Sequence, residues 1–247
     1  MKSQITGATA CCMLLATSVA QADEWDLSVG LGVQSEKSIY KGVGTESNLF
    51  PMWHADNGTI YLQGLEAGYR LYDNGGLSVA AIGQYRLEGY EASDSSALSG
   101  MTERKGAFEL GARASLETAY GEWSVTGLAD VSSEHSGHEL AFDWEKDIEI
   151  SQSFILTPTA GISWRSADLN NYYYGVRANE ATVNRAVYTA DAGTVASIGL
   201  DATWIIDKSQ MVRAGLEYSN YSSEISDSSI VERDNNTSAS VAYIWRF

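Results

Sequence analysis

The sequence predicts an all-β protein, an antiparallel transmembrane β-barrel of about ten strands (twelve is the alternative) with short periplasmic turns and long extracellular loops. Three observations lead to this fold class. The last eleven residues, 237–247, read TSASVAYIWRF and alternate between two faces as far as a terminal aromatic residue. About nine earlier segments repeat this two-faced pattern. Tight turns and long polar loops follow one another in alternation, as they do in outer-membrane barrels.

The first 22 residues predict a signal peptide for export. An apolar stretch over 8–19 precedes a small-x-small cleavage site at 20–22, and the stretch is too short for a transmembrane helix. Cleavage two residues earlier and lipidation at Cys11 or Cys12 are the alternatives. We expect cleavage after Ala22, which leaves 23–247 as one cysteine-free barrel domain in the outer membrane of a Gram-negative cell.

The composition argues against several classes of function. A formal net charge of −16 and a pI near 4.5 speak against a nucleic-acid partner, because phosphate binding needs clustered Lys and Arg. No apolar run after residue 22 reaches the length of a spanning helix, so in a membrane this chain has to form a closed sheet. A secreted β-sandwich is the alternative, and charges inside the strands argue against it.

The first half of the chain alternates cleanly over 25–34 and then becomes a polar loop. Three extended pieces precede residue 77, and counting each as a strand gives eleven strands in all. An odd number would leave the two termini on opposite sides of the membrane. We therefore interpret 46–72 as one long strand bent at 55–58. Asp73-Asn74-Gly75-Gly76 predicts a tight turn. Further strands are predicted over 77–88, 108–120 and 123–131, separated by the loop 91–105 and the turn 120–122.

The second half continues the same arrangement. Strands are predicted over 140–148, 154–165, 196–206, 212–218 and 237–247, with loops at 132–137, 166–193 and 222–236 and a turn at 207–209. If the final strand ends in the periplasm, turns and loops alternate as far back as residue 77, as the barrel fold requires.

Charged residues recur on the polar face of the predicted strands. In a narrow barrel they would point into the lumen, fill it and pair with one another, because unpaired charges there are costly. A small pore lined by the same groups is the functional alternative. The residues are Arg86, Glu88, Glu109, Arg113, Glu117, Asp143, Glu145, Arg165, Asp201, Arg213, Glu217 and Arg246.

The histidines do not predict an enzyme. His135 and His138 are flanked by Glu134 and Glu139, a combination that can bind Zn²⁺, but their spacing lies in a predicted loop and a solvated loop is the favoured interpretation. His54 stands alone and predicts a packed or interfacial side chain. Since no Ser–His or Asp–His set lies on rigid strands, we expect no catalytic residues, no cofactor and no metal.

The longest irregular stretch, 166–193, is rich in aromatic residues. Tyr172, Tyr173 and Tyr174 are followed by Gly175 and Val176. Loops of this length tend to be functional, and three adjacent tyrosines predict an ordered loop that folds over the barrel mouth or contacts a partner.

The final strand predicts an assembly signal. Val241, Tyr243, Trp245 and Phe247 share one face, which we expect to contact outer-membrane lipid and to be read by the bacterial barrel assembly machinery. Arg246 should point inward at the periplasmic rim.

At these segments the chain resembles the MipA/OmpV family of outer-membrane proteins, over nearly its whole mature length. Regions 91–105 and 132–150 match the family less clearly. The segments that carry the resemblance are Gly30 with Gly32, Tyr40-Lys41-Gly42, Leu49-Phe50-Pro51, Tyr173-Tyr174-Gly175-Val176 with Glu180-Ala181, Ser228-Ser229-Ile230-Val231-Glu232, and Trp245-Arg246-Phe247.

This resemblance implies a non-enzymatic barrel of the cell envelope. The namesake of the family is described as a scaffold that joins a lytic murein transglycosylase to a peptidoglycan synthase, and other members are linked to adhesion or antibiotic response. We therefore expect a scaffold or interaction protein with murein hydrolase and synthase partners. A narrow channel for small solutes and an adhesin are the alternatives.

Overall fold

The computed structural model describes residues 25–247, which form thirteen strands and two short helices. The predicted signal peptide, 1–22, lies outside the described residues. In chain order the elements are β1 (Asp26–Lys37), β2 (Thr45–Asp56), β3 (Ile60–Gln63), β4 (Glu66–Asp73), β5 (Leu77–Arg86), β6 (Ala107–Thr118), β7 (Gly121–Asp130), β8 (His138–Glu145), β9 (Ile148–Ser151), β10 (Phe154–Arg165), α1 (Ala167–Tyr174), β11 (Gly193–Ile205), β12 (Gln210–Tyr221), α2 (Ser223–Ser226) and β13 (Asn235–Arg246).

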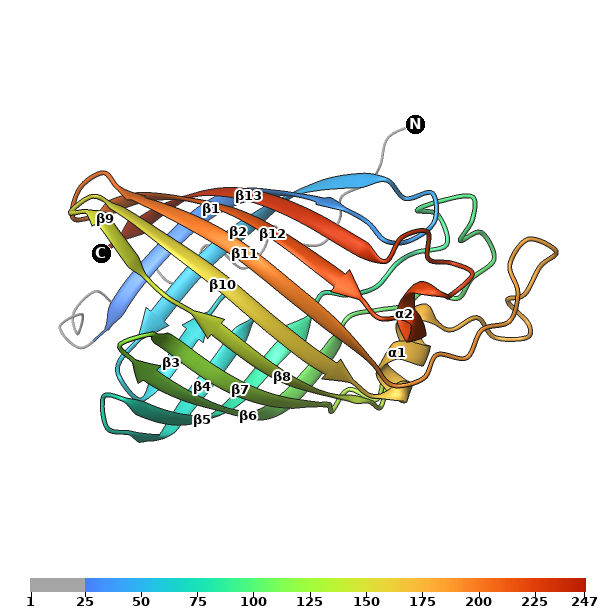
Figure 1. Cartoon of the computed structure of the whole chain (residues 1–247), viewed down its shortest axis with the longest axis horizontal. Helices are drawn as coiled ribbons and strands as arrows, with labels where there is room; N and C mark the ends of the chain where they lie inside the picture. The colour runs from blue at the N-terminus through green and yellow to red at the C-terminus, as the bar shows by residue number, and fades with distance from the viewer. Residues whose placement is uncertain (1–24) are drawn as a thin grey trace, which may run out of the picture.

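The strands close into a single antiparallel barrel (Figure 1). β1 pairs with β13, and the Phe247 amide donates to the Leu27 carbonyl at 2.9 Å, so the first and last strands are neighbours. β8 and β9 both pair antiparallel with β10, which makes them one strand interrupted at 146–147. β10 also pairs with β11 and completes the ring. The barrel wall therefore has twelve strands, and the predicted fold class is confirmed.

The count of ten strands was too low by two because 46–72 is three strands instead of one bent strand. The chain turns first at Gly58 (φ +83°), where the Asp56 and Asn57 side chains accept backbone N–H bonds. It turns again at Gly64 (φ +54°). β3 has only four residues, too few to show a period, and no Asn-Gly or Pro pair marks the second turn. The alternative count of twelve is the one confirmed.

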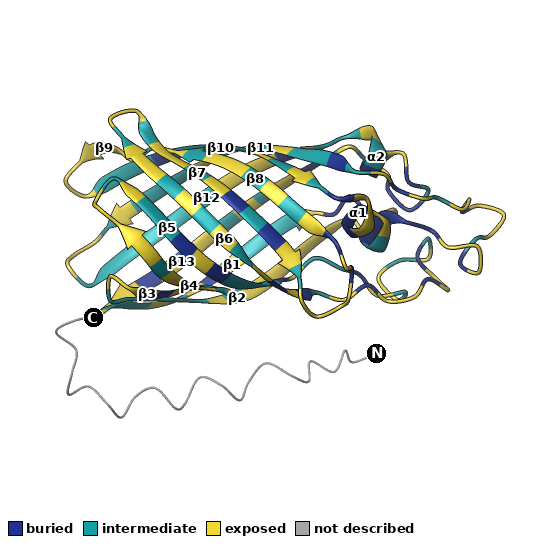
Figure 2. Cartoon of the chain, turned by 90° about the horizontal axis from the view of Figure 1, so that it is seen from below, coloured by how far each residue is buried: buried dark blue, intermediate teal, exposed yellow. Residues whose placement is uncertain are grey.

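Alternation along each strand separates a lipid-facing surface from the lumen, visible as alternating bands in Figure 2. In β13 the outward residues Tyr243 and Trp245 are 40% and 47% exposed, whereas the alternate residues Ala242 and Ile244 are buried. Large exposed aromatic residues lie near both ends of the strands, as in the aromatic girdles of membrane barrels. Those near the short turns are Tyr120, Trp123, Trp204 and Trp245, and those near the long loops are Phe108, Trp164 and Tyr218.

Short turns and long loops occupy opposite ends of the barrel, as predicted. At the turn end, the Gly75 amide donates to the Asp73 carboxylate and the Gly76 amide donates to the side-chain oxygen of Asn74. These two bonds close the β4–β5 turn. At the loop end lie both helices (Figure 1). Between residues 25 and 247, none of the helices is long and apolar enough to cross a membrane.

Candidate functional site

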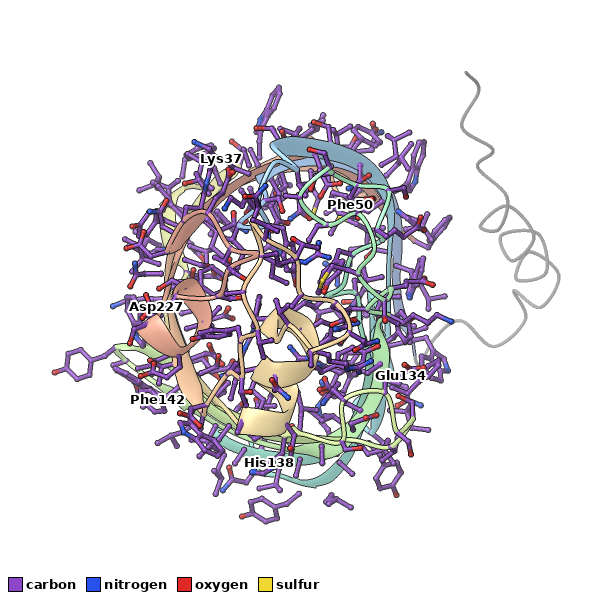
Figure 3. All side chains as sticks on the ribbon, turned by 90° about the vertical axis from the view of Figure 1, so that its right-hand side faces the viewer. Lys37, Phe50, Glu134, His138, Phe142 and Asp227 are labelled. Carbon is purple, nitrogen blue, oxygen red and sulfur yellow. The ribbon has the colours of Figure 1, made fainter. Side chains whose placement is uncertain are left out.

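The loop end of the barrel is closed by a plug, the term used here for the packed loops 38–44, 87–106, 166–192 and 222–234. Seen from that end, α1 lies inside the ring of strands (Figure 3). The buried apolar core of the plug draws side chains from all four loops. Its members are Ile39, Tyr40, Tyr90, Leu98, Met101, Leu169, Tyr173, Tyr174, Val176, Ile225, Ile230 and Val231.

Helix α1 places the aromatic loop inside the mouth. Ser166 caps the helix and accepts the Leu169 amide at 3.4 Å, with Asp168 in the first turn where it favours the helix dipole. The buried face of the helix carries Tyr173 and Tyr174, which are 0% and 2% exposed. The loop therefore folds into the barrel mouth, the first of the two arrangements that the sequence predicts for it.

The five residues predicted as an interaction loop have different environments. Tyr173, Tyr174 and Val176 are buried in the plug. The Tyr172 hydroxyl donates to Glu134 at 3.1 Å and also accepts the Lys105 amide at 2.9 Å. These contacts are all within the chain, and partner binding through the loop stays a prediction.

A buried ion pair latches two of the plug loops together. Arg104 and Glu180 are both about 1% exposed, and the guanidinium donates to both carboxylate oxygens at 3.0 and 3.1 Å. The amides of Thr102 and Arg177 donate to the same carboxylate. Arg185 adds bonds to the carbonyls of Ala97 and Ser99. We call this Arg104–Glu180 pair, with Arg185, the latch.

The latch stabilises the plug over a pH range that the pKa of Glu180 sets. Burial alone would raise the pKa of Glu180, but the hydrogen bonds from Arg104 and from backbone amides outweigh it and lower the pKa to about 2. An unfolded Glu has a pKa of about 4.3. The stabilisation is therefore fully present above about pH 4.3 and is lost as pH falls through about 2.

We expect the plug to stay closed from pH 7 to about pH 4.5 and to loosen only below that range. Hydrogen exchange of the amides in 177–192, corrected for the pH dependence of the intrinsic rate, measures this in the wild type and in Glu180→Gln. The variant should show weaker protection that no longer depends on pH. Loss of wild-type protection already at pH 5 would contradict the role of the latch.

Beneath the plug lies a charged layer that we call the ionic belt: Arg86, Glu88, Glu109, Glu139 and Arg165. Arg86 contacts three of the carboxylates, at 3.3, 3.0 and 3.2 Å from Glu88, Glu109 and Glu139. Arg165 contacts Glu88 at 3.2 Å and Glu139 at 3.0 Å. All five side chains are less than one-fifth exposed. The predicted cross-linked interior is therefore present at this level.

The plug and the belt share a direct contact. Tyr174 of α1 donates its hydroxyl proton to Glu88. Burial raises the pKa of Glu88, but Arg165 and Arg86 outweigh it, so the pKa lies below its usual value and the carboxylate stays charged. The charged Glu88 thus holds α1 against the belt.

His135 is buried beside the belt, whereas residues 131–134 and 136 of its loop are exposed, so the expected solvated loop is right for these neighbours and wrong for His135. Its Nδ1 accepts the Gly137 amide at 3.0 Å, and its Nε2 lies 3.2 Å from the Glu109 carboxylate. His138 is exposed and lies against Trp164, with ring centroids 5.4 Å apart. The two histidines thus have different partners. Ser133 and Ser136, on either side of His135 in this loop, have positive φ values of 62° and 54°.

Below the belt the lumen opens toward the turn end as a vestibule, a cavity of about 730 Å³ that reaches the turn residues Gly75 and Gly76. A second cavity of about 350 Å³ shares lining residues with it and extends up to Arg165. The lining groups include eight carboxylates and three guanidinium groups. They are Asp56, Asp73, Glu117, Glu122, Asp143, Glu145, Asp201 and Glu217, with Arg70, Arg113 and Arg213.

The vestibule charges are only partly paired. Arg70 contacts Asp56 at 2.6 Å and Arg213 contacts Asp201 at 3.1 Å. Glu122 lies directly opposite both Glu117 and Glu145 in the strand registers, and such like-charged neighbours repel. The predicted lumen charges therefore form an ion-paired belt above and an acidic vestibule below.

The final strand has the faces that the sequence predicts. Val241, Tyr243, Trp245 and Phe247 are 40–78% exposed on the outer surface. Arg246 pairs with Asp26 at 2.7 Å at the turn-end rim. Recognition of the outward stripe by the assembly machinery stays a prediction.

Comparisons with known proteins place the chain among outer-membrane proteins. The sequence model described as "MltA-interacting protein MipA" matches residues 29–247. The outer membrane protein OmpV of Vibrio cholerae is 30% identical over 197 residues, 77% of this chain and 75% of the relative. The MltA-interacting protein of Escherichia coli is 24% identical over 225 residues, 90% of each chain. Among solved structures, the NanC porin aligns with 90% of this chain and 100% of its own, at a TM-score of 0.47 and 8% identity.

Proposed function

The chain belongs to the MipA/OmpV family of outer-membrane proteins, and from that premise we propose that it is a non-conducting, non-enzymatic barrel that binds a periplasmic partner of the peptidoglycan machinery. The protein resides in the outer membrane. We place its turn end in the periplasm and its plug outside, by the general rule that outer-membrane barrels have short periplasmic turns and longer external loops. The observation that carries the proposal is the asymmetry of the lumen, which is filled at the outer mouth and open at the periplasmic end.

The plug argues against solute passage. Leu169, Tyr173, Ile225 and Ile230 are completely buried at the mouth. Apolar side chains packed across the mouth oppose the passage of hydrated solutes, and the belt beneath adds a layer of paired charges. A polar vestibule that is open at the turn end and closed above by the belt and the plug suits binding better than transport.

The periplasmic side supports a scaffold role linked to murein enzymes. One relative is named for its interaction with MltA, and we extend the kind of partner, a murein hydrolase, to this chain. The accessible part of the vestibule is acidic, with Glu117, Glu122 and Glu145 in adjacent registers. A complementary partner would present basic residues to this rim.

Two measurements test this function. Purified barrel in planar bilayers is expected to give no unitary conductance, and immobilised barrel is expected to retain a lytic murein transglycosylase from a detergent extract of the envelope. Steady single-channel currents of the wild-type protein would favour the narrow-channel alternative. Failure to retain any murein hydrolase or synthase in several detergents would remove the scaffold role.

The outward stripe of β13 completes the proposal as the signal for barrel assembly. Val241, Tyr243, Trp245 and Phe247 lie on the outer surface of the strand that seals the barrel against β1. This arrangement suits an element that the assembly machinery contacts before closure.

A further inference from the structure

The barrel wall has a gap beside the outer half of β2. The β3–β4 hairpin turns back at 64–65, only four residues after β3 begins (Figure 1). β2 pairs with β1 over its whole length but with β3 only over its last three residues, 54–56. The Gly64 amide donates to the Trp53 carbonyl at 3.0 Å, and this bond marks the hairpin tip. We call the gap above the tip, between 45–52 and the segment 87–90 that continues β5, the window.

The edge of the window carries backbone groups that have no partner in the described chain. Alternate residues of an antiparallel strand turn their N–H and C=O groups to the same side. Since the Trp53 carbonyl faces β3, the backbone groups of Thr45, Ser47 and Leu49 face the window. Within 25–247 none of these amides or carbonyls has a hydrogen-bond partner on that side. Two missing strands correspond to about 10 Å of wall at the ordinary strand spacing.

Pro51 shows that the edge is not built to receive another strand. Like Leu49 and Trp53, it is one of the alternate residues of β2 whose backbone faces away from β1, so an amide at this position would point into the window. Proline has no N–H to donate, and within sheets it is confined largely to edge strands. Its presence removes one unsatisfied donor and blocks regular strand addition at the centre of the window.

The window lies at the level of the acyl chains of the outer leaflet. Pro51 and Leu49 pair with Leu31 and Val33 of β1, whose side chains are 59% and 48% exposed on the lipid-facing surface. The next residues toward the loop end on that face of β1 are Ser35 and Lys37, which suit the headgroup region. Lipid therefore contacts the window directly.

The inner side of the window is apolar next to the hairpin tip, at Phe50 and Met52, and polar above it, at Asn48 and Glu46. Phe50 (labelled in Figure 3) lies so close to Gly32 that a Cβ there would be 2.5 Å from its ring, and the Ala242 methyl lies 3.0 Å from the same position. Because Ala242 faces the lumen, Phe50 and Met52 do so too. Asn48 on the same face is exposed, as a gap in the wall would produce.

A second apolar surface lies on the inner wall below the window. Tyr61, Ala80, Ile82 and Leu128 form a cluster of their own on the inner wall, separate from the core of the plug. They lie on β3, β5 and β7, below the hairpin tip: Tyr61 pairs with Asp56 of β2 and with Gly68 of β4, and Ile82 also pairs with Gly68. An apolar patch of the lumen wall thus lies on the turn-end side of the window.

We propose that the window is a lateral entrance that takes the acyl chain of an outer-leaflet amphiphile onto Phe50 and Met52. A hydrocarbon chain fits the chemistry of both sides, since it is already present in lipid and it covers apolar side chains without needing hydrogen bonds. A polar solute would gain nothing from Phe50 and would have to cross the membrane interior to reach the gap. The plug closes the axial mouth, and one of its loops contacts the chain just above the window, where the Ser95 hydroxyl donates to the Lys41 carbonyl at 2.7 Å.

Quenching of a bimane fluorophore on single cysteines tests the entrance in lipid nanodiscs. Cys11 and Cys12 precede the predicted cleavage site, so protein purified from membranes needs no other change. The label is placed at Met52→Cys inside the window, at Leu49→Cys on the lipid face, and at Ser197→Cys on the inner wall where β11 pairs on both sides. One arm uses phospholipids with doxyl-labelled acyl chains, and the other adds doxyl-stearic acid to unlabelled discs.

Quenching at residue 52 should lie within about twofold of that at residue 49 in at least one arm, and residue 197 should not be quenched. The two arms distinguish a resident lipid chain from a free fatty acid. In the Met52→Cys background, Phe50→Glu should reduce quenching several-fold while Phe50→Leu preserves it, with heat-modifiable migration confirming that each barrel is folded. Equal, negligible quenching at residues 52 and 197 in both arms would overturn the proposal.

Discussion

Replacing residues 167–192 with a short Gly-Ser linker is expected to convert a silent barrel into a conducting one. The replacement removes α1 and with it Leu169, Tyr173, Tyr174 and Val176, four of the twelve buried residues of the plug core. Arg165 and Gly193 lie directly opposite one another in the strand register, so a turn of a few residues joins β10 to β11 without moving either strand. The remaining loops lose the apolar surface on which they pack.

Planar-bilayer recording checks this expectation by the appearance of unitary currents. The pore should prefer cations, because eight carboxylates and only three guanidinium groups line the vestibule. The matched control is Val183→Ser with Val187→Ser, which alters two exposed residues of the same loop and leaves the core untouched; it should stay silent. A linker variant that is folded and still silent would show that the ionic belt alone closes the lumen.

Periodicity predicts the barrel wall well because lipid imposes a simple rule on every strand. Outward positions such as Leu31, Leu110 and Tyr243 are apolar and exposed, and the inward ones carry the charges. The rule needs six or more residues to be recognised. β3, with four residues and a turn that rests on Gly64 alone, gives no such pattern, and the window above it was therefore invisible in the sequence.

The plug could be predicted only in outline because its contacts join loops far apart in the chain. Three adjacent tyrosines indicate an ordered loop, yet nothing in the spacing of Arg104 and Glu180, 76 residues apart, indicates that they form a buried pair. His135 illustrates the same limit, since its burial depends on Glu109 from a different strand. Chemistry that depends on such long-range contacts has to be read from the structure.

Among single substitutions, Arg86→Met is expected to cause the largest loss of stability. Arg86 is 8% exposed and holds three carboxylates of the belt. Methionine keeps the apolar volume but leaves Glu88, Glu109 and Glu139 buried with Arg165 as the main counter-charge. Removing one partner from a buried ionic network costs about 3–5 kcal/mol of unfolding free energy. Urea unfolding in lipid vesicles, followed by heat-modifiable migration, measures the change.

Arg246→Met is the matched control, since it removes the same side chain from an ion pair that is half exposed. Arg246 and Asp26 are 51% and 42% exposed at the periplasmic rim, where solvent screens the charges, so the loss should stay below about 1 kcal/mol. Adding Glu109→Gln to Arg86→Met should recover part of the lost stability, because it removes one of the uncompensated buried charges. Similar small effects of Arg86→Met and Arg246→Met would mean that water reaches the belt, and the lumen would then be open where the packing indicates that it is filled.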